Sequence, residues 1–378
     1  MRLTIFIGQL ANGGAERQAS LLSNELARKG HSITLVTLYP REHYWQVLQQ
    51  QGRVHLQSLF AGRPLQKWRR VLHLLAVTFK LRRLLISKRS EVCYSILNWS
   101  NCLAFWATRF LSVRLVWQLC SSEKHFTWKQ RLPQLAAKAL SSRIDTIIAV
   151  SDSVRTFHTI LGFRPKRWEV IANGIDTETF SPDPASGLYL RKEWQIEDEA
   201  ILIGSVGRIT PVKGHVYFLK TAAELVKAYA KIKFVVVGGA VGGESAYRKF
   251  LKTYAAMLKL EDHLIWAGER HDMPEVYNAL NLLMNCSSSE GGPTVIAEAM
   301  ACGIPCVATD VGDCRNMIGD CGQIVPSGSA LALEKASLQM IENLGQNRSF
   351  ASKCRRRIEN HFSLNSMVQA TEAVLASS

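Results

Sequence analysis

Apolar residues recur along this chain in two alternating patterns, and each predicts a different kind of element. Short runs of Val, Ile, Leu and Phe, bounded by Gly, Asn, Asp or Pro, predict strands that are buried on both faces. Between them, apolar residues return every three or four positions, which predicts amphipathic helices. The strand runs lie at residues 3–8, 31–38, 92–97, 114–119, 146–151, 201–208, 233–239, 263–268, 282–287 and 305–310. This alternation predicts the α/β class, with parallel sheets covered by helices on both faces.

The first forty residues illustrate the pattern as one strand-helix-strand unit. A buried strand leads into a turn at Gly13 and Gly14, and a helix follows from Ala15 to Lys29. Gly30 is then a natural helix stop, because glycine adopts the left-handed conformation that ends helices.

The alternation of strands and helices occurs twice, which predicts two doubly wound, Rossmann-like domains. Residues 168–184 combine a strand, a turn and a Pro-rich connection, and we place the domain boundary there. The first domain then covers residues 1–170 and the second residues 171–363, while a helix at about 364–378 could pack on either. We expect the domains to face each other across a cleft, with ligands beyond the carboxyl ends of the strands.

One loop in the second half carries two cations directly after a strand. Arg208 and Lys213 follow the strand at 201–208 and precede a helix that starts near Gly214. Two fixed cations at this edge of a sheet are suited to a diphosphate and to the charge that grows on a leaving group. The alternative is a pair of solvated surface cations.

A second loop, "SSEGGPT", follows the strand at 282–287 and leads into a helix that Gly303 ends. Pro293 suits the first helical position, and the free N–H groups near Thr294 and Val295 form an anion site. Glu298 lies about one turn into this helix, where a carboxylate can accept hydrogen bonds from both hydroxyls of a ribose. This placement requires that Ile296 and Ala299 face the sheet. The alternative is a buried, paired carboxylate.

Glu290, on the loop before this helix, can reach a sugar ring on the other side of the phosphates. The loop and helix therefore offer a sugar contact, a phosphate contact and a ribose contact in order. The alternative is a Glu290 that only caps the helix.

The segment "EGGPTVIAEAMACGIPCVATDVGD", with "GRITPVKGH", "NGID" and "GGAERQ" elsewhere, resembles the retaining GT-B glycosyltransferases of family 4. The resemblance covers nearly the whole chain and is most specific in residues 286–315. It implies the GT-B fold, a nucleotide-sugar donor and no cofactor. The family's donor-binding positions correspond here to Gly13, Gly14, Arg208, Lys213, Arg270, Glu290, Gly291, Gly292, Thr294, Val295 and Glu298.

Each of these positions carries an implied role. Glu298 would bind the ribose, and Glu290 would contact the donor sugar, helped by the backbone at Gly291, Gly292 and Thr294. Arg208 and Lys213 would hold the diphosphate. The Gly13 and Gly14 backbone would meet the donor phosphate when the cleft closes, and Arg270 would lie beside the base.

The chain departs from the family at two positions. Many relatives carry a His or Arg over the reacting sugar carbon, where this chain has Cys120; His125 is the nearest histidine, and Glu123 and Lys124 are other candidates. A front-face retaining mechanism needs no enzymic nucleophile, so this change does not by itself imply inactivity. Gly292 replaces an aromatic residue of many relatives, which gives either a roomier sugar pocket or a more flexible loop.

Charge divides the chain into a basic and a slightly acidic half. Residues 1–170 hold 26 Lys and Arg against 8 Asp and Glu, whereas residues 171–378 hold 20 against 23. The segment Arg63–Arg89 has nine cations and no acid, with a helical stripe of Trp68, Leu72, Leu75, Phe79 and Ile86. This composition favours a helix lying on an anionic membrane surface. The alternative is a core-facing helix with a solvated basic face.

The sequence gives little support for nucleic-acid binding, a metal site, disulfides, a signal peptide or a membrane span. The basic half lacks a helix-turn-helix pattern, zinc ligands and an RNA-binding aromatic signature, so no nucleic-acid partner is expected. The clustered acids at residues 176–178 and 197–199 do not directly follow a strand at the ligand edge of the sheet, so we expect no metal site. The nine cysteines include no C-x-x-C pair, which favours buried thiols in a reducing compartment. The apolar run at the start is too short for a signal peptide, and the uncharged run Val92–Thr108 is better explained by a strand and a helix.

Together these features predict a cytoplasmic glycosyltransferase, peripheral on the cytoplasmic face of the inner membrane. It would transfer a hexosyl or N-acetylhexosaminyl group from a UDP-sugar to a polyprenyl-diphosphate-linked saccharide in exopolysaccharide, capsule or lipopolysaccharide assembly. Two alternatives are transfer to a soluble small acceptor and a catalytically silent GT-B binding protein.

Overall fold

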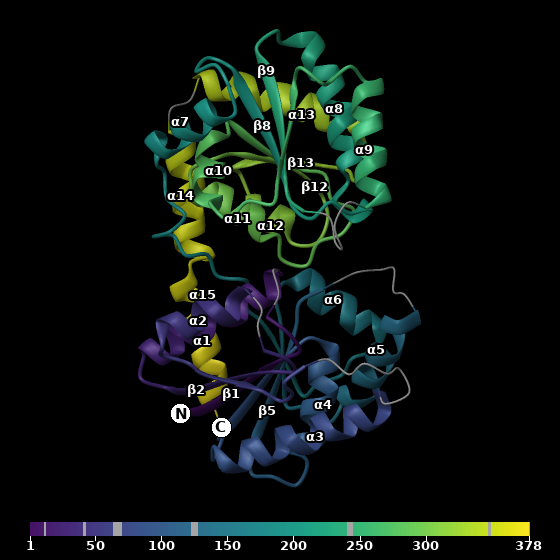
Figure 1. Ribbon diagram of the computed structural model, residues 1–378, viewed down its shortest axis with the longest axis vertical. Helices are drawn as coiled ribbons and strands as arrows, with labels where there is room; N and C mark the ends of the chain where they lie inside the picture. The colour runs from purple at the N-terminus through teal and green to yellow at the C-terminus, as the bar shows by residue number, and fades with distance from the viewer. Residues whose placement is uncertain are drawn as a thin grey trace. The chain divides into compact units, whose positions relative to one another are not determined.

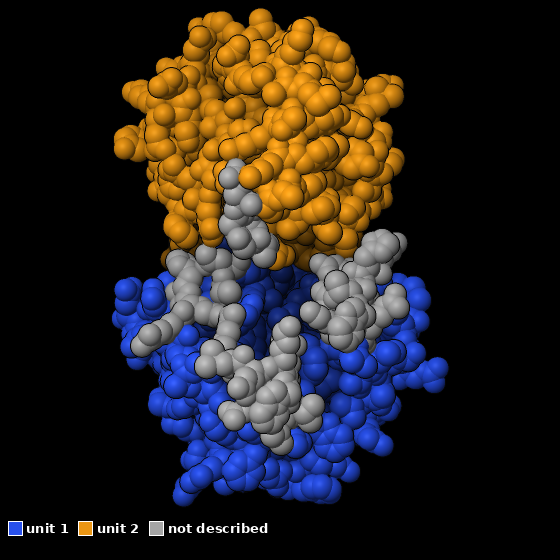
Figure 2. Space-filling view, turned by 45° about the vertical axis from the view of Figure 1, so that its right-hand side comes forward, with its two compact units in different colours: residues 1–174, 364–378 blue, residues 175–363 orange. Residues whose placement is uncertain are grey.

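The computed structural model describes residues 1–10, 13–40, 43–62, 70–121, 128–239, 245–346 and 349–377. The chain forms two compact units, coloured separately in Figure 2. Unit 1 comprises residues 1–174 and 364–378, and unit 2 comprises residues 175–363. The first stretch of unit 1 extends to Gly174. It includes residues 167–170, which form the last strand of the first sheet.

Unit 1 is built on a parallel sheet with the strand order β3-β2-β1-β4-β5-β6-β7. Its strands, as far as the structure describes the chain, are β1 (Arg2–Ile7), β2 (Ser32–Thr37), β3 (His55–Ser58), β4 (Val92–Ile96), β5 (Arg114–Leu119), β6 (Thr146–Ala149) and β7 (Arg167–Val170). Ile5, on the inner strand β1, is paired with Leu35 on one side and Tyr94 on the other. Inner strands such as β1 and β4 are mostly apolar and almost wholly buried because helices cover both faces of the sheet.

Helices cover both faces of this sheet (Figure 1). They are α1 (Gly14–Arg28), α2 (His43–Gln51), α3 (Arg70–Ser87), α4 (Asn98–Thr108), α5 (Trp128–Ser141), α6 (Asp152–Leu161) and the C-terminal α15 (Leu364–Ala376). Leu22 of α1 and Val368 of α15 share one core cluster. Leu81 of α3 and Ala104 of α4 share another. The C-terminal helix therefore packs within unit 1.

Unit 2 repeats the design with a parallel sheet of order β10-β9-β8-β11-β12-β13. Its described strands are β8 (Ile201–Val206), β9 (Ile232–Val237), β10 (Leu264–Gly268), β11 (Leu282–Asn285), β12 (Cys306–Thr309) and β13 (Gly322–Val325). Its described helices are α7 (Pro184–Glu193), η2 (Pro211–Lys213), α8 (His215–Ala228), α9 (Ala246–Met257), α10 (Met273–Ala279), α11 (Thr294–Ala301), α12 (Cys314–Ile318), α13 (Ala330–Gln346) and α14 (Phe350–His361). Phe218 of α8, Leu251 of α9 and Leu333 of α13 pack in one core cluster.

The predicted fold class is confirmed, and the strand runs of the sequence all form strands. Two strands were missed, β3 and β13, because both lie at a sheet edge and mix polar with apolar residues. Pro293 was expected at the first position of α11 but precedes the helix as its N-cap. All nine cysteines are free, and none of the described helices is long and apolar enough to cross a membrane.

Candidate functional site

The two predicted loops of unit 2 lie at the point where the strand order reverses. β8 is the first strand of unit 2, and its neighbours are β9 on one side and β11 on the other. The helices that follow β8 and β11 therefore leave toward opposite faces of the sheet, which opens a crevice beyond their carboxyl ends. The loops at residues 207–214 and 286–293 form this edge.

Backbone contacts join these two loops into one unit. Gly214 has a φ of 67°, and a Cβ at this position would lie 2.0 Å from the carbonyl oxygen of Cys286. Next to it, the Ser288 N–H donates a 2.8 Å hydrogen bond to the Val212 carbonyl. Only glycine fits at position 214, because both the left-handed backbone and the close approach exclude a side chain.

Glu290 is held at this edge by side chains from both loops. The Lys213 ammonium lies 2.6 Å from Glu290 Oε1, and the Ser287 hydroxyl donates to the same oxygen at 2.6 Å. The Asn285 amide approaches it at 3.5 Å. The Glu290 side chain is only 10% exposed and that of Lys213 22%. The sequence predicted both charged residues, whereas Ser287 and Asn285 carried no signal that would single them out.

Glu298 occupies the second turn of α11 with its side chain buried between helices. The residue is 3% exposed, and its Oε2 accepts a 2.8 Å hydrogen bond from the hydroxyl of Tyr277 on α10, which is itself fully buried. Ile296 and Ala299 are buried too, and whether Glu298 meets a ribose stays a prediction. Sequence reasoning missed Tyr277, because a tyrosine at that distance along the chain gives no sign that it meets the carboxylate.

Thr294 and Val295 form the first turn of α11, and both are half-buried, as are Gly291 and Gly292. The Pro293 that precedes them has no N–H of its own, and the helix has no side-chain cap. The first N–H groups of a helix have no partner within it and favour an anion. This helix start therefore lies in the same loop as Glu290.

The two arginines predicted for the donor lie in different surroundings. Arg208 is exposed on the loop after β8 and forms no ion pair with any residue that the structure describes. Arg270, after β10, instead donates to Asp272 and, at 2.7 Å, to Glu193. Hydrogen bonds to Asp272 and then Glu193 raise the pKa of the Arg270 guanidinium. That Arg270 lies beside the base of the donor stays a prediction.

The predicted positions of unit 1 lie around the start of α1. Glu16 folds back over the loop, so that a Cβ on Gly13 would lie 2.1 Å from its carboxylate, whereas a Cβ on Gly14 would meet nothing within 4 Å. Burial and then the nearby Glu16 charge raise the pKa of the Cys120 thiol to about 12, so this thiol is protonated at neutral pH. Whether the Gly13 and Gly14 backbone meets a donor phosphate stays a prediction. His125, Glu123 and Lys124 lie outside the described residues.

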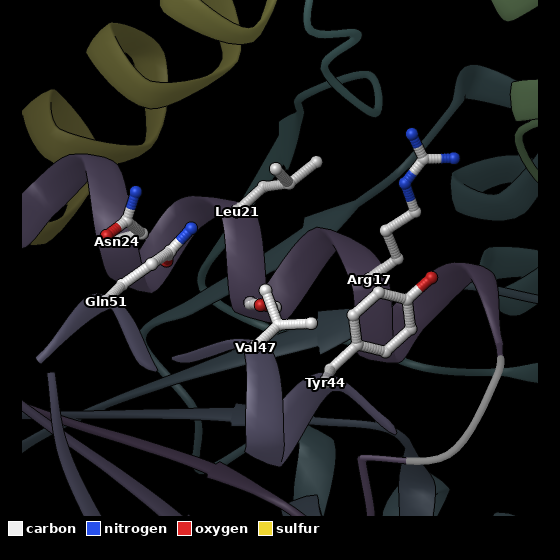
Figure 3. Close-up of a pocket in the computed structure, with 7 residues that line it drawn as sticks. Arg17, Leu21, Asn24, Tyr44, Val47 and Gln51 are labelled. Carbon is white, nitrogen blue, oxygen red and sulfur yellow. The ribbon is translucent and has the colours of Figure 1, made fainter. Parts of the chain in front are cut away.

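Unit 1 also carries a small groove between α1 and α2 that the sequence did not predict. Its volume is about 90 Å³. The residues that line it are Arg17, Ser20, Leu21, Asn24, Tyr44, Val47 and Gln51. Figure 3 shows the Asn24 and Gln51 amides at one end and Arg17 with Tyr44 at the other. With one cation in its lining, the groove offers a diphosphate less charge than the loops of unit 2.

Two family models match the two halves of the chain. "Glycosyltransferase Family 4" matches residues 12–179, and "Glycosyl transferases group 1" matches residues 189–360. The solved structure of Anabaena Alr3699/HepE is similar to the whole chain, with a TM-score of 0.86, 22% identity and full coverage of both chains. The chain is a GT-B glycosyltransferase. Its unit 2 sheet edge, with Lys213 and Glu290, is therefore the candidate site of a glycosyl-transferring enzyme.

Among the relatives of this glycosyltransferase, one is named for lipopolysaccharide core biosynthesis and another for a lipid-linked substrate. The lipopolysaccharide core biosynthesis mannosyltransferase LpsB of Rhizobium meliloti (strain 1021) is 26% identical over 71% of this chain and 73% of its own length. A UDP-Gal:α-D-GlcNAc-diphosphoundecaprenol α-1,3-galactosyltransferase of Escherichia coli is 29% identical over 39% of this chain. The chain spans 38% of that relative's length.

Proposed function

We propose that this enzyme transfers a hexosyl or N-acetylhexosaminyl group, with retention, from a UDP-sugar to a polyprenyl-diphosphate-linked saccharide. The reaction would extend an exopolysaccharide, capsule or lipopolysaccharide precursor. The observation that carries the proposal is the joint placement of Lys213, Glu290 and the start of α11 on two interlocked loops at the switch point of the sheet.

The donor fits these loops part by part. The diphosphate lies against Arg208, Lys213 and the N–H groups of Thr294 and Val295, all of which favour negative charge. Lys213 has three ammonium protons, so it can keep its bond to Glu290 and still donate to a phosphate oxygen. The Anabaena relative was crystallised with UDP and with UDP-glucose, which supports this choice of donor.

The two glutamates contact the two sugars of the donor. Glu298 accepts hydrogen bonds from the ribose hydroxyls, with Tyr277 holding its carboxylate. Glu290, fixed by Lys213 and Ser287, accepts from hydroxyls of the transferred sugar. Gly291 and Gly292 leave room beside it, so the backbone can approach this sugar closely.

The chemistry follows from this placement. The acceptor hydroxyl oxygen bonds to the anomeric carbon on the face from which UDP departs, and the bond between that carbon and the diphosphate oxygen breaks. The acceptor proton passes to the departing diphosphate. Arg208 and Lys213 stabilise the charge that grows on this leaving group, so we propose that the reaction proceeds without a metal ion.

The acceptor assignment rests on the Escherichia coli relative, whose name specifies a diphosphoundecaprenol-linked substrate, and on the basic character of unit 1. An acceptor that is both anionic and embedded in lipid would keep the enzyme at the cytoplasmic face of the inner membrane. The helix α3 and the segment before it supply many of the cations, although Arg63–Arg69 lie outside the described residues.

Arg208→Gln tests the donor assignment. We expect kcat to fall by about 10²–10³ because one stabilising charge is lost from the transition state. Arg315→Gln is the matched control, since Arg315 is an exposed arginine of unit 2 that pairs with Asp310. A screen of nucleotide sugars for transfer to a polyprenyl-diphosphate acceptor provides the readout. An Arg208→Gln variant as active as the control would refute the proposed site.

A further inference from the structure

Helix α3 presents apolar side chains on two opposite faces. Val77, Leu81 and Leu85 are buried in the core of unit 1. On the outer face, Phe79 is 66% exposed and Ile86 is 56% exposed, with Leu75 one turn before Phe79. A helix at the surface of a protein surrounded by water normally carries polar residues there. Of the predicted outward stripe, Trp68 lies outside the described residues.

The end of α4 continues this exposed apolar surface. Trp106 is 55% exposed, and Phe110, just after the helix, is 87% exposed. Phe110 has a φ of 63°, a left-handed backbone that is unusual for a bulky residue, and the Arg109 guanidinium lies 4.8 Å from its ring centroid. The turn thus holds an aromatic ring and a cation together in solvent.

Arg82 joins the two helices into one surface. Its guanidinium donates to the carbonyl oxygens of Ala107, at 3.3 Å, and Arg109, at the end of α4. Phe79 and Ile86 are three and four residues from Arg82, so they lie on the same side of α3. Helix α3 packs against α4, as Figure 1 shows, and the Arg82 hydrogen bonds tie the outer side of α3 to the end of α4. We name the set Leu75, Phe79, Ile86, Trp106 and Phe110 the aromatic face.

The charge around the aromatic face is almost entirely positive. Residues 70–112 contain seven Lys or Arg and one acid, Glu91, which is paired with Arg2 at 2.7 Å. Arg83 on α3, Arg89 just after it and Arg109 just after α4 are all exposed. Exposed aromatic and aliphatic side chains with cations nearby suit the surface of an anionic bilayer. The rings can enter the headgroup layer, and the cations can pair with lipid phosphates.

We propose that the aromatic face is the membrane-docking surface of this enzyme, with Trp106 and Phe110 as its anchors and an anionic phospholipid bilayer as its partner. The inference rests on the proposed function in one respect, the membrane-borne acceptor. It adds the end of α4 to the basic helix that the sequence alone indicated.

Flotation with vesicles of phosphatidylglycerol and phosphatidylcholine tests the proposal. We expect Trp106→Gln combined with Phe110→Gln to lower the vesicle partition coefficient about tenfold, because two apolar side chains no longer leave water. The control combines Met257→Gln and Leu331→Gln, two exposed apolar residues of unit 2, and should float like the unchanged enzyme. Equal flotation of the anchor variant and the control would overturn the proposal.

Removing two cations in the same flotation assay tests whether the lipid must be anionic. Arg83→Gln with Arg89→Gln should lower the partition coefficient about fivefold per cation. Vesicles of phosphatidylcholine alone should bind the unchanged enzyme far less, and equal binding to both vesicle types would also overturn the proposal. Hydrolysis of the UDP-sugar in the absence of lipid should be unchanged in all these variants. An unchanged enzyme that floats but neither binds nor hydrolyses any UDP-sugar would instead contradict the proposed function alone.

Discussion

At the scale of single residues, the two glutamates of the site are held in different ways. Glu290 is paired with a cation, Lys213, whereas the Glu298 carboxylate accepts from a neutral phenol, Tyr277. A phenol donates one hydrogen bond, whereas a carboxylate can accept several. In the proposed donor complex, ribose recognition by Glu298 would therefore depend on Tyr277, a residue outside the two loops.

Replacing Tyr277 by Phe should weaken UDP binding. The change removes only the hydroxyl that orients Glu298, and we expect the Kd for UDP to rise up to about tenfold. The Kd for a UDP analogue that lacks the 2′-hydroxyl should change less, because it already lacks one of the hydrogen bonds that Glu298 accepts. Isothermal titration calorimetry measures both. Tyr189→Phe, at an exposed tyrosine of α7, is the control.

A Tyr277→Phe variant that binds UDP and its deoxy analogue as the unchanged enzyme does would contradict the role given to Tyr277. A variant that loses affinity for both ligands equally would indicate a structural role instead.

His215 should make the fold sensitive to acid. Burial, with a smaller contribution from Lys213, lowers the pKa of this imidazole to about 4. Between pH 6.5 and 4 the unfolded chain therefore binds a proton that the folded chain excludes. The free energy of unfolding should fall as the pH drops through this window, by up to about 3 kcal/mol from this group.

Urea unfolding at pH 7 and pH 4.5 measures this effect. His215→Gln should lose less stability between the two pH values than the unchanged protein, and the exposed His361→Gln should behave like the unchanged protein. An identical pH dependence in all three would contradict the prediction.

At the scale of elements, the contact between the loops after β8 and β11 depends on a backbone that only glycine supplies. Gly214→Ala should cost about 1–3 kcal/mol more stability than Gly328→Ala, because both force a left-handed residue but only the first collides with the Cys286 carbonyl. Thermal unfolding compares the two variants. Affinity for UDP should fall only in Gly214→Ala, since Lys213 is the direct neighbour of Gly214. Equal losses of stability and of UDP affinity in the two variants would show that the two loops do not depend on each other.

The strands and loops also show which parts of the fold and of the site could be predicted from the sequence. The strand at β8 and the loop containing Lys213 were predictable because buried parallel strands are apolar runs and ligand loops follow them. The edge strand β13 was not, since its Gly-Gln-Ile-Val run is short and mixed. The partners of Glu290 and Glu298 were not predictable either. Ser287 and Tyr277 are ordinary residues in their own segments, and only the folded arrangement brings them to the carboxylates.

At the scale of the whole molecule, unit 1 is completed by α15 from the far end of the chain. Val368 and Leu375 of this helix are each 1% exposed and pack with Leu22 and Ile5. Leu375→Ala should destabilise unit 1 by about 2–5 kcal/mol, because it leaves a cavity in this core. Gln369→Ala, on the exposed side of α15, should cost less than 1 kcal/mol. Urea unfolding followed by tryptophan fluorescence tests both, and similar losses would argue against a core role for α15.

The route of the chain sets an order of events during its synthesis. A ribosome releases the first 174 residues early, but the helix that covers the Leu22 side of their sheet is made only after unit 2. All of unit 2 is available to fold before α15 emerges. Until then the nascent first unit exposes an apolar strip on its sheet and α1, which is the kind of surface that chaperones bind.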